Sequence, residues 1–96
     1  MIGVVATLKV QDGKGAEFET IFRQLAAKVR ANEAGTFVYQ LTRSRVEANT
    51  YKVLEVYKDQ ESLTAHGGTE YSRELGRKMV PYMAGRPDVE MLDAVE

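Results

Sequence analysis

The chain has 96 residues, of which 44% are hydrophobic and 28% charged, which predicts one folded domain over residues 1–96 and excludes the disordered and membrane-spanning classes. Thirteen basic and fourteen acidic side chains leave a net charge of −1 without any block of like charge, so we expect neither nucleic acid nor a membrane as a partner. The absence of cysteine excludes disulfides and thiol chemistry, and an N-terminus without a basic segment or cleavage site argues against a signal peptide, so we expect a cytoplasmic protein.

The first third of the chain predicts a strand followed by a helix. Apolar and polar residues alternate over 2–10, which is the period of a strand with one buried face. The turn "QDGKG" then leads into a helix that we expect to end near "NEAG", with Gly35 as its stop. Apolar side chains recur in this helix at spacings of three and four residues: Phe18, Ile21, Phe22, Leu25, Ala26 and Val29.

Two further strands are predicted over 36–44 and 50–58, because both segments are rich in aromatic and β-branched residues. The stretch "RVEAN" between them has the length of a hairpin connection. In the second of these strands, alternation places Leu54 and Val56 on one face. The other face carries Tyr51, Val53, Glu55 and Tyr57.

The last third predicts a short helix, a second helix and a final strand. Asp59 is a candidate cap for a helix over "QESLTAH", which Gly67 and Gly68 are expected to end by taking positive φ angles. Thr69 is a candidate cap for the next helix, which Pro81 ends. Its apolar stripe comprises Tyr71, Leu75, Met79 and Tyr82 or Met83, and residues 88–95 best fit a strand.

This order of elements, strand, helix, strand, strand, helix, strand, is that of a ferredoxin-like α+β fold. Such a fold is a four-stranded antiparallel sheet with its helices on one face, which leaves the other face uncovered in a monomer. We expect Val53 and the tyrosines of the middle strands to lie on or near the uncovered face. Burial of that face against a second copy predicts a homodimer.

The stretch "YKVLEVYKDQESLTAHGGTEY" resembles the signature region of the antibiotic biosynthesis monooxygenase domain family. The resemblance lies in a strand that ends with Glu55 and Tyr57, a capped helix that ends with Ala65 and His66, and Thr69 before the next helix. The beginning of the chain, "IGVVATLKVQDGKGAEFETIF", and the run "AGTFVYQL" also fit the family pattern. The sequence departs from it at Tyr71, where many members have a histidine.

The resemblance implies a dimeric α+β barrel with a pocket between the helices and the sheet of each subunit. Enzymes of this family oxygenate electron-rich phenols, quinols or anthrones with molecular oxygen and use neither metal nor flavin. By this resemblance the chain is a cofactor-independent monooxygenase acting on a small aromatic quinol or phenol. A related branch binds and degrades haem, but this sequence lacks the tryptophan, the later helix histidine and the asparagine of the first strand that this branch uses.

His66 is the candidate catalytic base, because an unperturbed imidazole titrates at about 6.5 and an aromatic alcohol must lose a proton before it reduces oxygen readily. The alternative is that its ring bonds backbone carbonyls where its helix ends. Glu55 is either a second catalytic group that orients His66 or the substrate, or one half of an ion pair with Arg43 or Arg45. The ion pair is the favoured interpretation.

Four further side chains are candidates for contacting an aromatic substrate: Tyr57, Tyr71, Phe22 and Met79. Packing in the core is the simpler role for each of them. One histidine, no cysteine and no clustered carboxylates at ligand spacing argue against a metal site. A non-catalytic dimer that binds a small ligand or acts in a stress response is the alternative function, and haem binding is the third.

Overall fold

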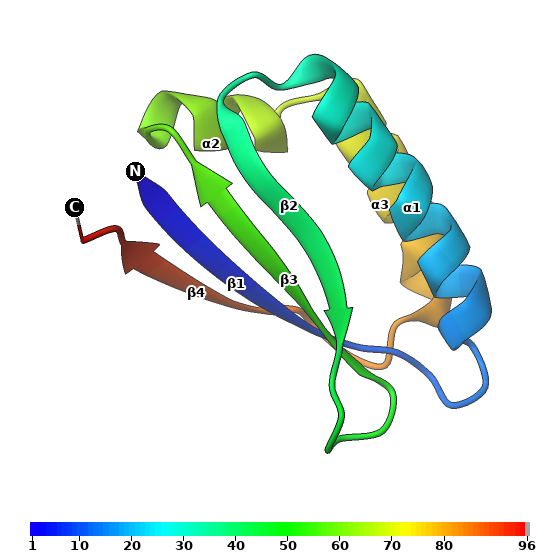
Figure 1. Ribbon diagram of the computed structural model, residues 1–96. Helices are drawn as coiled ribbons and strands as arrows, with labels where there is room; N and C mark the ends of the chain where they lie inside the picture. The colour runs from blue at the N-terminus through cyan, green and yellow to red at the C-terminus, as the bar shows by residue number, and fades with distance from the viewer. Residues whose placement is uncertain (96) are drawn as a thin grey trace.

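The computed structural model describes residues 1–95 as one sheet with its helices on a single side (Figure 1). The strands are β1 (Ile2–Lys9), β2 (Thr36–Arg43), β3 (Thr50–Tyr57) and β4 (Asp88–Asp93). The helices are α1 (Gly15–Asn32), α2 (Gln60–Gly67) and α3 (Glu70–Met79), and a 3₁₀ turn covers Val80–Tyr82. This is the predicted ferredoxin-like order, with two helices rather than one between β3 and β4.

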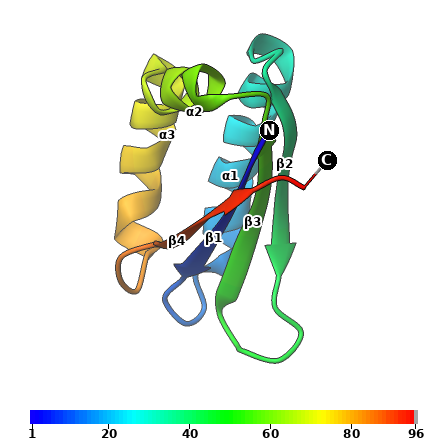
Figure 2. The same ribbon diagram turned by 90° about the vertical axis from the view of Figure 1, so that its left-hand side faces the viewer.

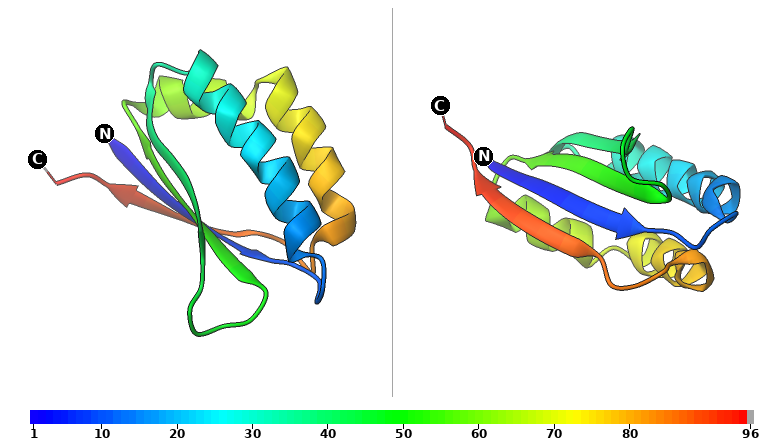
Figure 3. Two further views of the ribbon diagram at one scale, coloured as in Figure 1. Left: turned by 45° about the vertical axis from the view of Figure 1, so that its right-hand side comes forward. Right: turned by 90° about the horizontal axis from the view of Figure 1, so that it is seen from below.

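All the strand pairs are antiparallel, and the sheet order is β2-β3-β1-β4. The two ends of the described chain therefore lie side by side at one end of the sheet (Figure 3). Leu41 faces Val53 across the β2–β3 pair and Val4 faces Met91 across the β1–β4 pair. A register shift between Thr36 and Val38 marks a bulge at the start of β2.

The core lies between the sheet and the helices α1 and α3. The apolar stripe of α1 is buried there, as its spacing predicts, and Leu75 of α3 packs against it. Tyr57 and Phe18 are among the most completely buried large side chains. Tyr71, Met79, Tyr82 and Met83 border the core, which confirms the apolar stripe expected in the last third of the chain.

The expectation for the uncovered face was wrong about its residues. Tyr51, Val53 and Tyr57 face the helices and are buried, because their side of β3 is the one that α1 and α2 cover. Figure 2 looks onto the other face, which no helix covers. One half of this uncovered face is apolar. The strand register places Val38, Leu54 and Leu92 in this apolar half, and 41%, 42% and 43% of their surfaces are exposed.

Two helix caps are confirmed, and α2 ends at its two glycines as predicted, but without the positive φ angles expected of them. The Asp59 carboxylate accepts from the amide of Ser62 at 2.9 Å, and the Thr69 hydroxyl accepts from the amide of Ser72 at 3.3 Å. Gly67 and Gly68 do not take positive φ, and Gly68 ends α2 at −92° by donating to carbonyls of the preceding turn. Helix α2 thus ends without a left-handed residue.

Gly35 is constrained by packing rather than by a left-handed backbone. A Cβ added to it would lie 2.2 Å from the Ser62 Oγ and 2.7 Å from the Ser62 Cβ, so the chain between α1 and β2 passes directly against α2. Helix α1 itself ends earlier, at Asn32, with Glu33 as the residue that follows.

We expect Gly35→Ala to lower the free energy of unfolding by about 1–3 kcal/mol, because the added methyl group forces α2 away from the sheet. The matched control is Gly76→Ala inside α3, where an added Cβ meets nothing within 4 Å and alanine favours the helix by about 0.5–1 kcal/mol. Urea denaturation measures both. Equal effects of the two substitutions would show that the contact with Ser62 is unimportant.

Candidate functional site

His66 lies in the last turn of α2 and points its Nδ1 at the carboxylate of Glu33. The ring nitrogen lies 2.9 Å from Glu33 Oε1 and 3.1 Å from Oε2. Only 12% of the histidine side chain and 11% of the glutamate side chain are exposed. The ring therefore does not bond the carbonyls at the end of its own helix, which was the alternative interpretation from sequence, because a buried carboxylate from another element holds it.

Glu33 is the centre of this cluster. Besides His66, its carboxylate accepts from the hydroxyl of Tyr71 and, at 2.7 Å, from the hydroxyl of Thr36. Its position just beyond α1 is unfavourable for an anion, since the C-terminal end of a helix carries partial negative charge. Three side-chain donors compensate for this. Sequence reasoning missed Glu33, and the only signal of its role is an acidic residue at the wrong end of a helix.

The contact with Glu33 fixes how the imidazole carries its proton. A carboxylate can only accept, so the neutral ring must place its hydrogen on Nδ1 and leave a lone pair on Nε2. Carboxylates commonly orient a histidine in this way. The pair is therefore arranged as a general base whose reactive atom is Nε2.

Two tyrosine rings lie next to the imidazole. The ring centres of Tyr39 and Tyr57 are 5.1 Å and 5.6 Å from that of His66, with tilted planes. Both tyrosines are buried, and burial raises the pKa of each phenol. Phe22 stacks on the far side of Tyr39 with a centre distance of 5.5 Å. The imidazole thus lies between aromatic rings on one side and the Glu33 carboxylate on the other.

Glu55 binds Tyr57 rather than an arginine. The Tyr57 hydroxyl donates to Glu55 Oε1 at 2.5 Å, whereas Arg43 pairs with Glu19. The expected ion pair of Glu55 with Arg43 or Arg45 is therefore wrong, because Glu55 lies on the helix-covered face of β3. Burial raises the pKa of the Glu55 carboxyl and the negative charge of Glu33 adds to this, against the opposing influence of Tyr57 and His66.

The raised pKa of Glu55 predicts that the free energy of unfolding depends on pH. In the folded protein Glu55 keeps its proton up to a higher pH than in the unfolded chain. The free energy of unfolding therefore falls as the pH rises from the ordinary pKa of 4.5 through the pKa of the folded protein. We expect Glu55→Gln to be more stable than the natural protein at neutral pH, and this advantage to disappear below the ordinary pKa. Urea denaturation across this pH range tests the expectation, and an advantage that grows on acidification would contradict it.

The structure brings together four of the six residues proposed from sequence. Glu33 joins His66 to Tyr71, while Tyr57 contacts His66 and binds Glu55. Phe22 is one ring further away, behind Tyr39. Met79 lies apart from them, in an apolar hollow of about 310 Å³ that Leu8 and Phe18 also line.

The hollows around this cluster are open to the surface. Glu33 and Tyr71 line one of about 540 Å³ between the end of α1 and α2, so this carboxylate is reachable from outside. His66, Glu55 and Tyr57 do not line this hollow.

Comparison with known proteins identifies the family. The family model described as antibiotic biosynthesis monooxygenase matches residues 1–78. The chain belongs to this family. The match contains β1 to β3, the helices α1 and α2, and nearly all of α3.

Solved structures agree with the family assignment. A provisionally named antibiotic biosynthesis monooxygenase from Caulobacter crescentus CB15 shares 61% sequence identity, with a TM-score of 0.97 over 99% of this chain and 90% of that chain. A provisionally named member from Nitrosomonas europaea, at 18% identity and a TM-score of 0.90 over the full length of both chains, shares the fold. Among proteins of curated function, none matches the chain.

The described part of the chain contains neither a metal-binding cluster nor a membrane-spanning helix. Within residues 1–95, no three histidine, cysteine, aspartate or glutamate side chains lie close enough to hold a metal ion. No helix in the same range has the length and apolar character needed to cross a bilayer.

Proposed function

We propose that this chain is a cofactor-independent monooxygenase that oxidises a small aromatic quinol or phenol with molecular oxygen. Membership of the family supports the reaction class. The single observation that carries the assignment to this cluster is the imidazole of His66 held by the buried carboxylate of Glu33. The His66–Glu33 pair supplies a general base that can remove the proton of the substrate hydroxyl.

In the proposed reaction, Nε2 of His66 takes the proton of a substrate hydroxyl while Glu33 stabilises the imidazolium that forms. The resulting phenolate is a much better electron donor to oxygen than the neutral alcohol. One oxygen atom then forms a new C–O bond at a ring carbon, and the O–O bond breaks. The other oxygen leaves as water with two protons, one returned by the imidazolium and one lost by that ring carbon. For a quinol, the products are a hydroxyquinone and water, so the four electrons lost by the substrate reduce one dioxygen.

Other side chains of the cluster have supporting roles in this proposal. The Tyr71 hydroxyl shares the Glu33 carboxylate and thereby limits its movement, so we assign Tyr71 a positioning role. Glu55 and Tyr57 form a second hydrogen-bonded pair beside the ring and are candidates for orienting the substrate hydroxyl. Phe22 and Met79 are kept as proposed apolar contacts of the substrate.

We further propose that the active form is a homodimer joined through the uncovered sheet face. The apolar half of this face exposes a large part of Val38, Leu54 and Leu92, and contiguous apolar surface of this kind is typical of an interface. A two-fold axis would place the same patch of each subunit against the other. The His66 cluster lies on the opposite side of the sheet, so each subunit keeps its own site.

The test is oxygen consumption by purified, metal-stripped protein with reduced naphthoquinones and anthrones. We expect a rate that is proportional to protein concentration and exceeds the spontaneous oxidation of the substrate. A folded protein that leaves every substrate of the panel at its background rate would overturn the proposal.

A non-catalytic ligand-binding module is the second candidate, and the low exposure of the His66 side chain, at 12%, favours it. It predicts that quinones raise the Tm of the protein without any turnover.

A further inference from the structure

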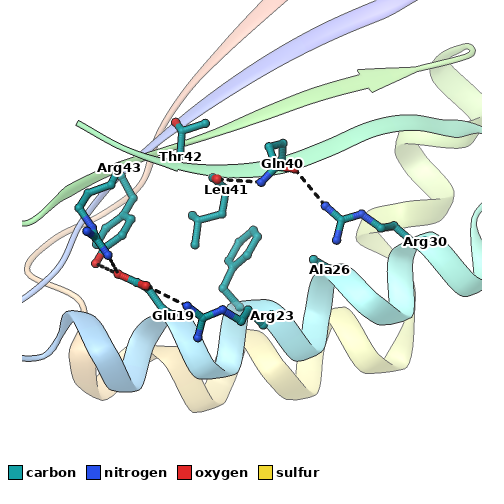
Figure 4. Close-up of a pocket in the computed structure, with 10 residues that line it drawn as sticks. Glu19, Arg23, Ala26, Arg30, Gln40, Leu41, Thr42 and Arg43 are labelled. Atoms are coloured by element: carbon teal, nitrogen blue, oxygen red, sulfur yellow. Dashed lines mark hydrogen bonds and ion pairs between the residues drawn. The ribbon is translucent and has the colours of Figure 1, made fainter. Parts of the chain in front are cut away.

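A groove between α1 and the edge strand β2 carries positive charge at both ends. Its volume is about 460 Å³, and it lies on the far side of α1 and β2 from α3 (Figure 4). The guanidinium groups of Arg23 and Arg43 stand at one end of the groove and that of Arg30 stands at the other, with Leu41 between them. His66, Glu33, Glu55, Tyr57 and Tyr71 do not line the groove, and Phe22 is the residue that it shares with the proposed substrate contacts.

The charges in the groove do not cancel. At one end the carboxylate of Glu19 forms ion pairs with two arginines, with oxygen-to-nitrogen distances of 2.5 Å to Arg43 and 3.2 Å to Arg23. At the other end Arg30 donates to the carbonyl of Tyr39 at 2.9 Å and to the side-chain oxygen of Gln40 at 3.3 Å, and both acceptors are neutral. Within residues 1–95, Arg30 has no carboxylate within ion-pair distance.

The floor between these charged ends is apolar. Phe22, Ala26 and Leu41 line it, and the first two are almost fully buried, so they form a fixed surface. A guanidinium held to neutral acceptors keeps donors available for a carboxylate, which it binds in a geometry that lysine does not provide. A flat apolar body would cover the floor while its acidic group meets Arg30.

We propose that this groove binds a small organic anion that consists of an aromatic or similar apolar body and a carboxylate, with the carboxylate on Arg30. The protein as a whole carries a net charge of −1, so the attraction is local to the groove. The volume is within the range of natural small-ligand sites and is sufficient for a two-ring acid.

An extended acidic peptide paired with β2 fits the groove less well. The edge carbonyls of Tyr39 and Leu41, which such a peptide would use, already accept hydrogen bonds from Arg30 and from the side chain of Gln40. A small molecule needs none of these backbone groups, so the observations favour it.

The test is a titration of the full chain with naphthoate, followed by two-dimensional NMR of the backbone amides, with naphthamide as the uncharged comparison. We expect saturable shifts in Gln40–Thr42 and the facing turns of α1, and at least fivefold weaker binding of naphthamide. We expect Arg30→Gln to weaken naphthoate binding at least fivefold and Arg30→Lys to weaken it less.

Arg45→Gln is the matched control, because it removes the same charge from an exposed residue that does not line the groove. It should change the affinity by less than a factor of two, and the dispersion of the NMR spectrum shows whether each variant is folded. Equal affinities for naphthoate and naphthamide, equal effects of Arg30→Gln and Arg45→Gln, or shifts confined to the residues around His66 would each overturn the proposal. None of these outcomes depends on whether the protein has oxygenase activity.

Discussion

We expect His66→Ala to lower kcat for oxidation of a naphthoquinol by about a hundredfold or more, because a positioned general base contributes roughly that factor. The variant should fold, since the hydrogen bonds of the ring go to one side chain, that of Glu33, and not to the backbone. Steady-state oxygen uptake measures the loss. Added imidazole should restore part of the rate, which a merely structural role of His66 does not predict.

Glu33→Gln is the companion variant, and its effect should be smaller. Glutamine keeps an acceptor for the Nδ1 hydrogen but loses the negative charge that stabilises the imidazolium. We therefore expect a lower kcat and a displaced pH–rate profile. A rate for His66→Ala equal to that of the natural protein would contradict the assignment of the base, even if the family activity were present.

Leu54→Glu should convert a dimeric protein into monomers, with a rise in the dissociation constant of about a hundredfold or more. Leu54 lies in the apolar half of the uncovered face, and a symmetric interface buries it twice. A carboxylate that loses its water there without a partner costs several kcal/mol, and each 1.4 kcal/mol is about a factor of ten. Light scattering after size-exclusion chromatography measures the change.

Gln24→Glu is the control for this experiment. It introduces the same carboxylate on the exposed side of α1, away from the uncovered face, so the dimer should persist. If the natural protein is a monomer at all accessible concentrations, or if Leu54→Glu remains as dimeric as the control, the proposed interface is wrong.

The fold follows closely from patterns that are local in the sequence. Alternation in β1 and the helical spacing in α1 each predict burial on one face. The structure buries most of the residues that they indicate, with Ile2, Ala6 and Ile21 only partly buried. The face on which β3 packs was harder to predict. Both of its faces carry apolar residues, and only the placement of α1 and α2 decides that Val53 is inside and Leu54 is outside.

The candidate site was only half visible in the sequence. His66 stands out as the one imidazole, but its partner Glu33 lies 33 positions earlier and belongs to another helix end. No spacing rule connects them, because the contact arises from the packing of α2 against the segment between α1 and β2. Glu55 is a different case, because its partner Tyr57 is two residues away on the same face of β3 and is not an arginine across the hairpin.

The most direct test of the central claim, that this chain catalyses oxygenation without a cofactor, is a single turnover of a naphthoquinol under dioxygen labelled with the heavy oxygen isotope. Metal-stripped protein should yield a hydroxyquinone that contains one labelled atom, at a rate that His66→Ala abolishes. A product without label, formed at the spontaneous rate in the natural protein and the variant alike, would contradict the account.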